Sequence, residues 1–360
     1  MKISSKIKDY HLEVCTNAFS QKETVLDLVP HQRRFYFIDK NFFETYQDAL
    51  TKFIGNDFYL LIEAHEDNKS YLKLADYYKA LIQAGLTRSD VLITFGGGIL
   101  QDISGFIAST LYRGIKWIFF PTTLLAQADS CIGSKTSINF EDVKNLIGTF
   151  YPPDLIVVDI QLTSSLNDTD FNSGLGEMIK FHLLSDAKHY ALLKKFLGQG
   201  NLRQSPYFKD LIASTLEIKK SYFEEDEFDT GRRNLLNYGH CFGHALESAS
   251  HFGIAHGEAV MVGMGFANLL SLKRGLMSKL KYDEFEAILR TYYPYFDFSR
   301  ITIDDLIRFM KKDKKRVTAD LTMILGRDIG DFGKFDDVKE EEVKAAYQEF
   351  IKAYAEVKHV

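Results

Sequence analysis

Short apolar runs alternate with helix-like segments along the first half of the chain. The apolar runs are bounded by Gly, Pro or Asp, which is typical of buried strands, and they span residues 33–39, 58–64, 90–98, 116–123 and 154–159. Between them, residues 70–85 and 100–114 have helical spacing, and the second of these segments follows a run of glycines. This alternation predicts a mainly parallel sheet with helices on both faces.

The pattern changes after about residue 160. Helical periodicity then dominates, in residues 173–197, 206–228, 236–252, 257–275 and 282–292, and the one strand-like run is 321–326. We therefore predict an α/β domain over residues 1–160 and an all-α domain over 161–360, joined near Pro152-Pro153 and the polar stretch 161–172. Ligands of doubly wound sheets bind beyond the carboxyl ends of the strands, so we expect the active site in the cleft between the domains.

Composition and charge exclude several classes of protein. A length of 360 residues suggests about two domains, and a net charge of -5 argues against a broad nucleic-acid-binding surface. Three cysteines without a CxxC pair argue against a disulfide framework and favour the reducing cytoplasm. No apolar run approaches the roughly 20 residues of a membrane span, and the N-terminal residues do not resemble a signal peptide.

Three glycines, Gly96 to Gly98, end a predicted strand and precede a predicted helix. Glycines at this position let the backbone approach a pyrophosphate, and the helix N-terminus supplies amide donors. The run lacks the GxGxxG spacing, so a tight strand-to-helix turn is an equal interpretation.

Histidines cluster between residues 240 and 256. His240 and His244 lie four residues apart and would share one face of a helix, with His256 and Glu258 following. Neutral imidazole is the commonest metal ligand, and a catalytic zinc ion typically takes three protein ligands. Glu177 could supply a carboxylate. The pattern predicts a metal site, although ordinary helical histidines would give the same spacing.

Several Lys and Arg residues occur in segments rich in Gly, Ser and Thr: Arg113, Lys135, Lys144, Lys180, Lys219 and Arg233. Convergent Lys and Arg side chains bind phosphate or carboxylate, whereas each one alone is more typical of a solvated surface. Asp102 and Asp129 lie beside apolar or small residues, and spacing does not choose among a helix cap, a ribose contact and a proton relay.

Taken together, these motifs resemble the 3-dehydroquinate synthase family of sugar-phosphate cyclases. The resemblance covers about residues 60–330 and includes GGGILQDISGFIASTLYRG, FPTTLLAQADSCIGSKTSIN, VKNLIGTFYPP, SGLGEMIK, RNLLNYGHCFGHALE, HGEAV and DKK. It implies a Rossmann-like N-terminal domain that binds NAD tightly, and an all-α C-terminal domain that holds a divalent metal, usually zinc, with cobalt as an option. It also implies a homodimer that acts on a phosphorylated sugar acid.

In that family, 3-deoxy-arabino-heptulosonate 7-phosphate becomes 3-dehydroquinate and phosphate. NAD oxidises a ring hydroxyl, phosphate leaves by β-elimination, the ketone is reduced back, and the opened enol closes by an aldol step. NAD is therefore recycled without net redox change, while the metal polarises the alcohol and ketone oxygens.

The resemblance also assigns roles to individual residues. The metal ligands would be Glu177, His240 and His256, with His244 as a hydrogen-bonding or proton-transfer neighbour. Substrate contacts would be Asp129, Lys135, Asn145 and Lys180, and Arg113 would reach phosphate across the dimer interface. The substrate carboxylate would be held by Lys219, Arg233, Asn237 and Lys314. Contacts to NAD and its phosphates would come from Lys69, Gly97, Gly98, Asp102, Thr122, Thr123, Lys135 and Lys144.

Five positions depart from the family pattern: Gln101, Ser134, Val143, Asp229 and Cys241. Ser134 and Val143 add bulk beside phosphate-binding loops, where small residues permit close backbone approach. The retained cations Lys219 and Arg233 favour a carboxylated substrate, hence 3-dehydroquinate synthase activity. The alternatives are a cyclase with a different sugar phosphate, an NAD-dependent polyol dehydrogenase and an inactive binding paralogue.

Overall fold

A computed structural model describes residues 1–21, 27, 33–141, 143–311 and 320–357. The chain divides into two compact units. The first comprises Met1–Leu166 together with Lys219–Glu227, and the second comprises Asn167–Ile218 and Phe228–Val360. The first unit therefore includes a short segment that lies far along the sequence, at the end of a helix.

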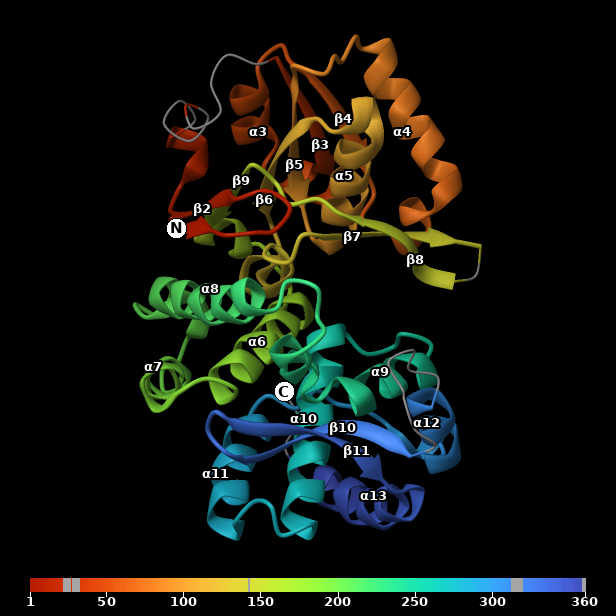
Figure 1. The fold of residues 1–360 in the computed structure, drawn as a ribbon. Helices are drawn as coiled ribbons and strands as arrows, with labels where there is room; N and C mark the ends of the chain where they lie inside the picture. The colour runs from red at the N-terminus through yellow and green to blue at the C-terminus, as the bar shows by residue number, and fades with distance from the viewer. Residues whose placement is uncertain (22–26, 28–32, 142, 312–319, 358–360) are drawn as a thin grey trace. The chain divides into compact units, whose positions relative to one another are not determined.

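The first unit is built on a mainly parallel sheet (Figure 1). Among the described residues, seven strands form it in the order β1-β2-β9-β6-β5-β3-β4. Only the edge strand β1 pairs antiparallel. The bounds are Lys2–Ile3 (β1), Tyr10–Cys15 (β2), Arg34–Asp39 (β3), Phe58–Ile62 (β4), Val91–Gly96 (β5), Lys116–Pro121 (β6) and Leu155–Asp159 (β9). The predicted α/β fold class is confirmed.

Helices cover both faces of this sheet because its central strands are apolar on both sides. Every residue of β5 is buried. On one face, Phe95 and Phe120 stack at 4.3 Å between ring centroids and contact Phe53 of α3 (Gln47–Ile54), which follows α2 (Lys40–Thr45). On the other face, α4 (Tyr71–Gln83) and α5 (Gly98–Thr110) pack. A buried stack of aromatic rings of this kind is a large part of the core's hydrophobic stabilisation.

Sequence periodicity did not reveal a second, antiparallel hairpin in this unit. Strands β7 (Lys135–Phe140) and β8 (Val143–Phe150) pair with each other, and β8 is largely exposed or half-buried. Their polar composition lacks the apolar alternation that marks a half-buried strand. The hairpin carries several of the expected ligand-binding residues.

The second unit is helical, as predicted, but it is not exclusively so. Strands β10 (Leu321–Asp328) and β11 (Asp331–Val338) form an antiparallel hairpin, so the expectation of an all-α domain is wrong in this detail. Only β10 has a continuous apolar run, whereas β11 alternates Phe and Gly with charged residues. The helices are α6 (Asp168–Leu183), α7 (Ala187–Leu197), α8 (Phe208–Glu225), α9 (His240–Ala249), α10 (His256–Lys273), α11 (Lys279–Leu289), α12 (Ile303–Met310) and α13 (Glu340–Ala355).

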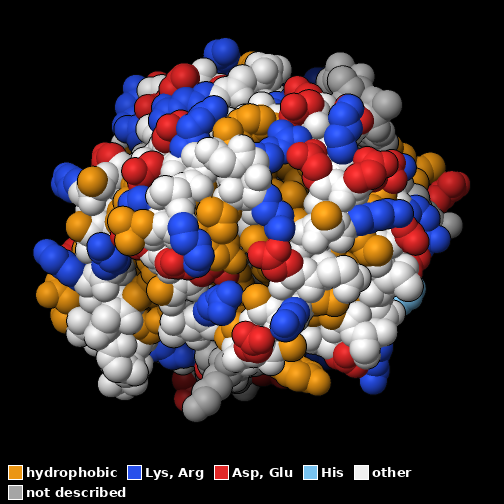
Figure 2. Space-filling view, turned by 90° about the horizontal axis from the view of Figure 1, so that it is seen from below, with side chains coloured by type: hydrophobic (Ala, Val, Ile, Leu, Met, Phe, Trp, Pro, Cys, Tyr) orange, Lys and Arg blue, Asp and Glu red, His pale blue; other side chains and the backbone are white. Residues whose placement is uncertain are grey.

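Helix α10 is the centre of the second unit. Residues Gly257 to Ser271 of this helix are all buried, and it packs on α6, α9, α11 and α13. A helix that is apolar on all sides needs such neighbours. None of the described helices combines the length and the hydropathy needed to cross a lipid bilayer. On the face shown in Figure 2, basic and acidic side chains are interspersed among small apolar areas.

Candidate active site

A buried carboxylate and two imidazoles converge in the second unit. Glu177 lies in α6 with a side chain that is 0% exposed, and its Oε1 is 3.6 Å from His240 Nε2 and 3.5 Å from His256 Nε2. Two ligands of one tetrahedral zinc ion, each about 2.0–2.2 Å from it, are roughly 3.3–3.6 Å apart. Glu177 Oε2 is ion-paired with Lys180, whereas the buried Oε1 has no hydrogen-bond partner of regular geometry, and a cation there would satisfy it. The three residues therefore fit a metal ion.

The other ring nitrogens of these histidines are held by acceptors. His240 Nδ1 lies 3.2 Å from the carbonyl oxygen of Tyr238, and His256 Nδ1 lies 3.3 Å from Glu247 Oε2. A carbonyl or a carboxylate can only accept, so each Nδ1 must carry the proton. In the neutral ring each Nε2 then presents a lone pair towards Glu177, which is the tautomer that a metal ligand requires. Burial would lower the pKa of His256, but the carboxylates of Glu177 and Glu247 raise it to about 10, so a bound cation would take the place of the proton on its Nε2.

The charges around Glu177 favour its ionised form. Burial by itself would raise the Glu177 pKa, but Lys180, which forms an ion pair with the carboxylate, and His256 together lower the pKa to about 2. Burial, together with the nearby Lys180 ammonium, lowers the pKa of His240 well below its usual value. An ionised carboxylate beside a neutral imidazole is the state in which both groups bind a divalent cation.

Glycines bring the helices of this site into backbone contact. A Cβ on Gly257 would lie 1.7 Å from the carbonyl oxygen of Ser173, and a Cβ on Gly176 would lie 2.2 Å from the carbonyl oxygen of Gly257. Helices α6 and α10 can therefore cross at this distance only with glycine at the contact. Glu177 and His256 are the immediate neighbours of these glycines, so the crossing sets the spacing between the two expected ligands.

The position of His244 allows a second possible set of metal ligands. Its ligand atom and those of His240 and His256 lie within 4.8 Å of one another, so three histidines could also hold an ion. His244 is exposed, however, whereas Glu177 is fully buried and faces both other imidazoles. The expectation that Glu177 is a ligand and His244 a neighbour stays a prediction.

A pocket of about 120 Å³ opens beside the histidines within the second unit. Asn237, His240 and His244 line it, as expected for a site where substrate meets metal. The hairpin β10–β11 adds Thr322 and Lys334, which sequence reasoning missed because they lie far along the chain in a segment without a recognised motif. Lys334 is a further cation for an anionic ligand. The remaining lining residues are Asn234, Cys241, Met310, Met323 and Ile324.

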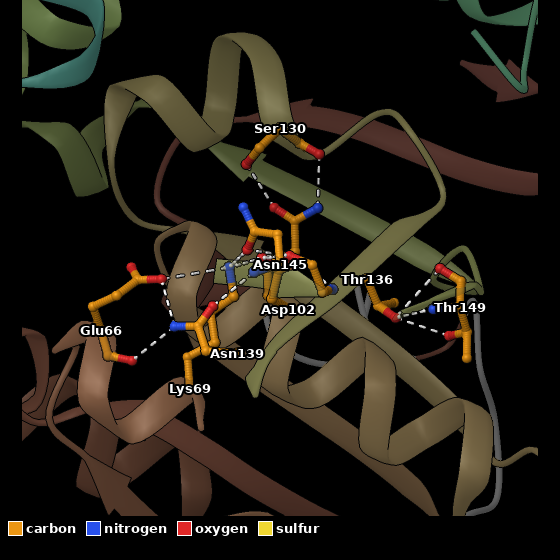
Figure 3. A network of polar contacts seen from close by, with 10 residues as sticks. Glu66, Lys69, Asp102, Ser130, Thr136, Asn139, Asn145 and Thr149 are labelled. Atoms are coloured by element: carbon orange, nitrogen blue, oxygen red, sulfur yellow. Dashed lines mark hydrogen bonds and ion pairs between the residues drawn. The ribbon is translucent and has the colours of Figure 1, made fainter. Parts of the chain in front are cut away.

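In the first unit, a polar network connects three of the expected ligand-binding residues (Figure 3). Lys69 Nζ lies 2.6 Å from Asp102 Oδ2 and donates to Asn145 Oδ1 at 2.7 Å. Ser137 donates to Asp102 through its backbone N–H at 2.9 Å and its Oγ at 2.7 Å. Burial raises the pKa of Asp102, and Lys69 and Ser137 act in the opposite direction. The network joins residues from α5 and from the hairpin β7–β8.

Further hydrogen bonds connect Asn145 and its neighbours to this network. The Asn145 backbone N–H donates to Asn139 Oδ1 at 2.9 Å, and Asn139 in turn donates to Glu66 Oε1 at 2.8 Å. Asn145 has a left-handed backbone with φ of 54°, which costs free energy and persists only where surrounding contacts impose it. Gln101, a departure from the family pattern, exchanges hydrogen bonds with Ser130.

The glycine run lies where sequence predicted, at the carboxyl end of β5. Gly98 begins α5, and the Thr122 backbone N–H donates to the Gly96 carbonyl at 3.0 Å. A Cβ on Gly97 would lie 3.0 Å from Thr123 Cγ2. The expected NAD contacts Gly97, Gly98, Thr122 and Thr123 are thus neighbours, beside the N-terminus of a helix, which is a favourable place for a pyrophosphate.

The remaining expected residues of the first unit fall into two groups. Asp129 and Lys219 are together, because the Lys219 ammonium contacts both the carboxylate and the carbonyl of Asp129. Lys135 and Lys144 are exposed on β7 and β8, and Arg113 is exposed in a turn with φ of 62°.

The other expected residues lie in the second unit, with one exception. Arg233 is buried in a short 3-10 helix, Arg232–Asn237, which also carries Asn237. Lys180 is 2% exposed beside Glu177. Lys314 falls outside the described residues. Among the departures, Ser134 has a φ of 59° and donates to Glu227 Oε1 at 3.2 Å, while Val143 is 41% exposed.

Comparison with known proteins first defines a class. The fold aligns with 2-epi-5-epi-valiolone synthase from Streptomyces hygroscopicus subsp. jinggangensis 5008, solved with NAD+ and Zn2+, at a TM-score of 0.85 and 26% identity, over 97% of this chain and 99% of that one. A 2-deoxy-scyllo-inosose synthase aligns at a TM-score of 0.84 and 21% identity, over 97% and 99% of the two chains, and so shares the fold. The architecture is that of the sugar-phosphate cyclases.

Sequence comparison then identifies the family. The 3-dehydroquinate synthase N-terminal domain matches residues 59–173, and the C-terminal domain matches residues 174–316. The 3-dehydroquinate synthase of Clostridium botulinum (strain Alaska E43 / Type E3) is 32% identical over 91% of this chain and 95% of its own. That of Dictyoglomus turgidum (strain DSM 6724 / Z-1310) is 36% identical over 83% of this chain and 84% of its own. The chain belongs to the 3-dehydroquinate synthase family.

Proposed function

We propose that this enzyme converts 3-deoxy-arabino-heptulosonate 7-phosphate to 3-dehydroquinate and inorganic phosphate. The observation that carries the proposal is the buried Glu177 carboxylate faced by the Nε2 atoms of His240 and His256. This metal-type site occurs in a chain whose relatives named 3-dehydroquinate synthase are 32% and 36% identical to it. The proposal includes NAD and a divalent cation, zinc or cobalt, as bound partners.

Each bound group would have its own residues. NAD would lie against Gly97, Gly98, Thr122 and Thr123, with Lys69 and Asp102 nearby, and the metal would be held by Glu177, His240 and His256. When bound, NAD supplies reversible hydride transfer, and the cation polarises substrate oxygens. Because the hydride is returned in the same catalytic cycle, the overall reaction consumes no cofactor.

The protein's own side chains would bind and orient the charged ends of the substrate. Asn237 and Lys334 line the pocket, and buried Arg233 lies on the same short helix as Asn237, which supports binding of an anionic group. Lys180 holds Glu177 ionised, and exposed His244 at the pocket wall is suited to exchange a proton with the substrate. A small neutral polyol would need no such set of cations, which disfavours a simple dehydrogenase.

A turnover assay tests the proposal. The purified protein with Zn2+ and NAD is given 3-deoxy-arabino-heptulosonate 7-phosphate, and phosphate and 3-dehydroquinate are measured. We expect equimolar products without net NADH. His256→Ala should abolish turnover and bound zinc, whereas His189→Ala, in an exposed histidine–carboxylate pair on α7, should retain both. Full activity of His256→Ala would refute the ligand assignment.

A related cyclase activity is the second candidate. The alignment with 2-epi-5-epi-valiolone synthase at a TM-score of 0.85 favours it, as does the bulk of Ser134 and Val143 beside expected phosphate-binding loops. A heptulose 7-phosphate without the carboxylate is the matched comparison substrate. Turnover of that compound, with none of the carboxylated one, would replace the leading proposal. Accumulation of NADH with glycerol would instead indicate a dehydrogenase.

We also propose a cytoplasmic homodimer. Cys15, Cys131 and Cys241 all lie in the described residues and form no disulfide, which supports a reducing compartment. Exposed Arg113 would contact phosphate across the dimer interface. Light scattering gives the mass in solution, and Arg113→Ala in a dimeric protein should then weaken substrate binding.

A further inference from the structure

Helix α9 presents a third polar residue on the face that carries the histidines. His240, His244 and Glu247 follow at i, i+4 and i+7, so they lie along one side of the helix. Glu247 is not among the site residues that the family resemblance assigns. Its side chain is 13% exposed, which is low for a carboxylate that serves only solubility.

Glu247 contacts the segment that leads to His256 in two ways. Its Oε2 lies 3.3 Å from His256 Nδ1, and its backbone carbonyl accepts a hydrogen bond of 2.7 Å from the Phe252 N–H. At the first of these contacts along the chain, His251 and Phe252 adopt left-handed conformations, with φ of 53° and 61°. Such conformations cost roughly 1–2 kcal/mol per residue. The contacts of this turn with α9 therefore hold it in its conformation.

We propose that Glu247 is a positioning residue for the metal site, acting through His256. Its carboxylate accepts the Nδ1 proton, which fixes the tautomer and ring orientation and aims the Nε2 lone pair at the ion held with Glu177. The arrangement differs from that of His240, whose Nδ1 is held by a neutral carbonyl. A carboxylate partner makes the imidazole a more basic ligand than a carbonyl does.

The inference rests on the proposed metal site, so its test measures metal binding directly. Zn2+ affinity would be determined by competition with a chromophoric chelator for the wild type, Glu247→Gln and Glu247→Ala. Loss of a carboxylate behind a ligating histidine typically weakens metal affinity about 10- to 100-fold. We expect Glu247→Ala to reach that range. Glu247→Gln should lose less, because the amide oxygen still accepts the Nδ1 proton but carries no charge.

Asp186→Asn is the matched control. Asp186 Oδ1 lies 2.9 Å from His189 Nδ1, so the same carboxylate-to-amide change is made beside a histidine on another helix. This control should keep wild-type zinc affinity. In Co2+-loaded protein, the visible absorption bands should shift in the Glu247 variants and stay unchanged in Asp186→Asn, which a purely structural role for Glu247 would not produce.

The outcomes separate the two proposals. If the wild type binds zinc and His256→Ala does not, but both Glu247 variants keep wild-type affinity and the same Co2+ spectrum, the positioning role is overturned while the metal site stands. If the wild type itself binds neither Zn2+ nor Co2+, the metal site fails first. Circular dichroism and thermal unfolding in excess chelator identify a variant that fails to fold. Glu247→Asp keeps the negative charge, so its zinc affinity should exceed that of Glu247→Ala.

Discussion

The glycine contact between α6 and α10 makes a quantitative prediction for Gly257→Ala. The added Cβ would lie 1.7 Å from the Ser173 carbonyl oxygen, and real contacts of this kind are essentially never below 3.0 Å. The helices would have to separate by about 1.3 Å, since no rotamer change moves a backbone oxygen or a Cβ. A metal site tolerates displacements of only about 0.5 Å, and His256 and Glu177 adjoin this contact.

The cost to stability can be estimated in the same way. Overpacking of a tight core costs roughly 1–3 kcal/mol, and backbone contacts lie at the upper end, while alanine gains about 1 kcal/mol over glycine in a helix. A net loss of about 2 kcal/mol lowers Tm by roughly 4–8 °C in a domain of this size. Zinc affinity should fall roughly tenfold or more.

Thermal unfolding in chelator and zinc competition measure the two effects separately. Gly200→Ala is the control, because a Cβ on Gly200 would have nothing within 4 Å. Wild-type Tm and zinc affinity in Gly257→Ala would refute the reasoning, because they would mean that the helices rearrange without moving the ligands.

Three further predictions concern other parts of the molecule. Burial lowers the pKa of His182 to about 4, whereas its pKa in the unfolded chain is about 6.5. The free energy of unfolding therefore includes the full contribution of neutral His182 above pH 6.5, and this contribution is lost as the pH falls towards 4. Denaturant titrations should show this as about 3 kcal/mol of pH dependence that His182→Gln lacks. Lys69→Met should weaken NAD binding at least tenfold by calorimetry, and it should destabilise the first unit because it leaves the Asp102 charge unpaired. Adding Asp102→Asn removes that charge, so it should recover stability but not NAD affinity. Lys334→Ala should raise KM several-fold with a smaller change in kcat. The control is Lys339→Ala, because Lys339 caps the start of α13 and is paired with Asp320, and it should change neither constant. An unchanged KM in Lys334→Ala would remove this lysine from the substrate site.

Local pattern was sufficient for much of the architecture. The five strands predicted in the first half correspond to β3, β4, β5, β6 and β9, because fully buried parallel strands are short, apolar and bounded by turn residues. The helix predicted over 173–197 is instead two helices, since Asp186 accepts hydrogen bonds from Lys188 and His189 and begins α7 there. The run predicted as strand-like over 321–326 corresponds to β10, but its partner β11 and the hairpin β7–β8 have mixed polarity, and their hydrophobic period was too weak to predict strands.

The candidate site was likewise predictable only in part from local sequence. The spacing of His240, His244 and His256 is a local property, and it indicated a metal site before any fold was known. The residues alone offered Glu177 as a possible carboxylate ligand, and the resemblance to a family assigned it to the metal. A one-dimensional pattern had no physical means of pairing it with histidines more than sixty residues away.

Tertiary structure decided which atoms meet. The backbone contact at Gly176 and Gly257 brings Glu177 within 3.5 Å of His256, and the turn of α9 places Glu247 behind the same imidazole. Lys334 reaches the pocket from a hairpin that carries no motif. Sequence alone determined the element types, the histidine cluster and the family. Ligand geometry depends on contacts between residues distant along the chain, and these exist only once the helices have packed.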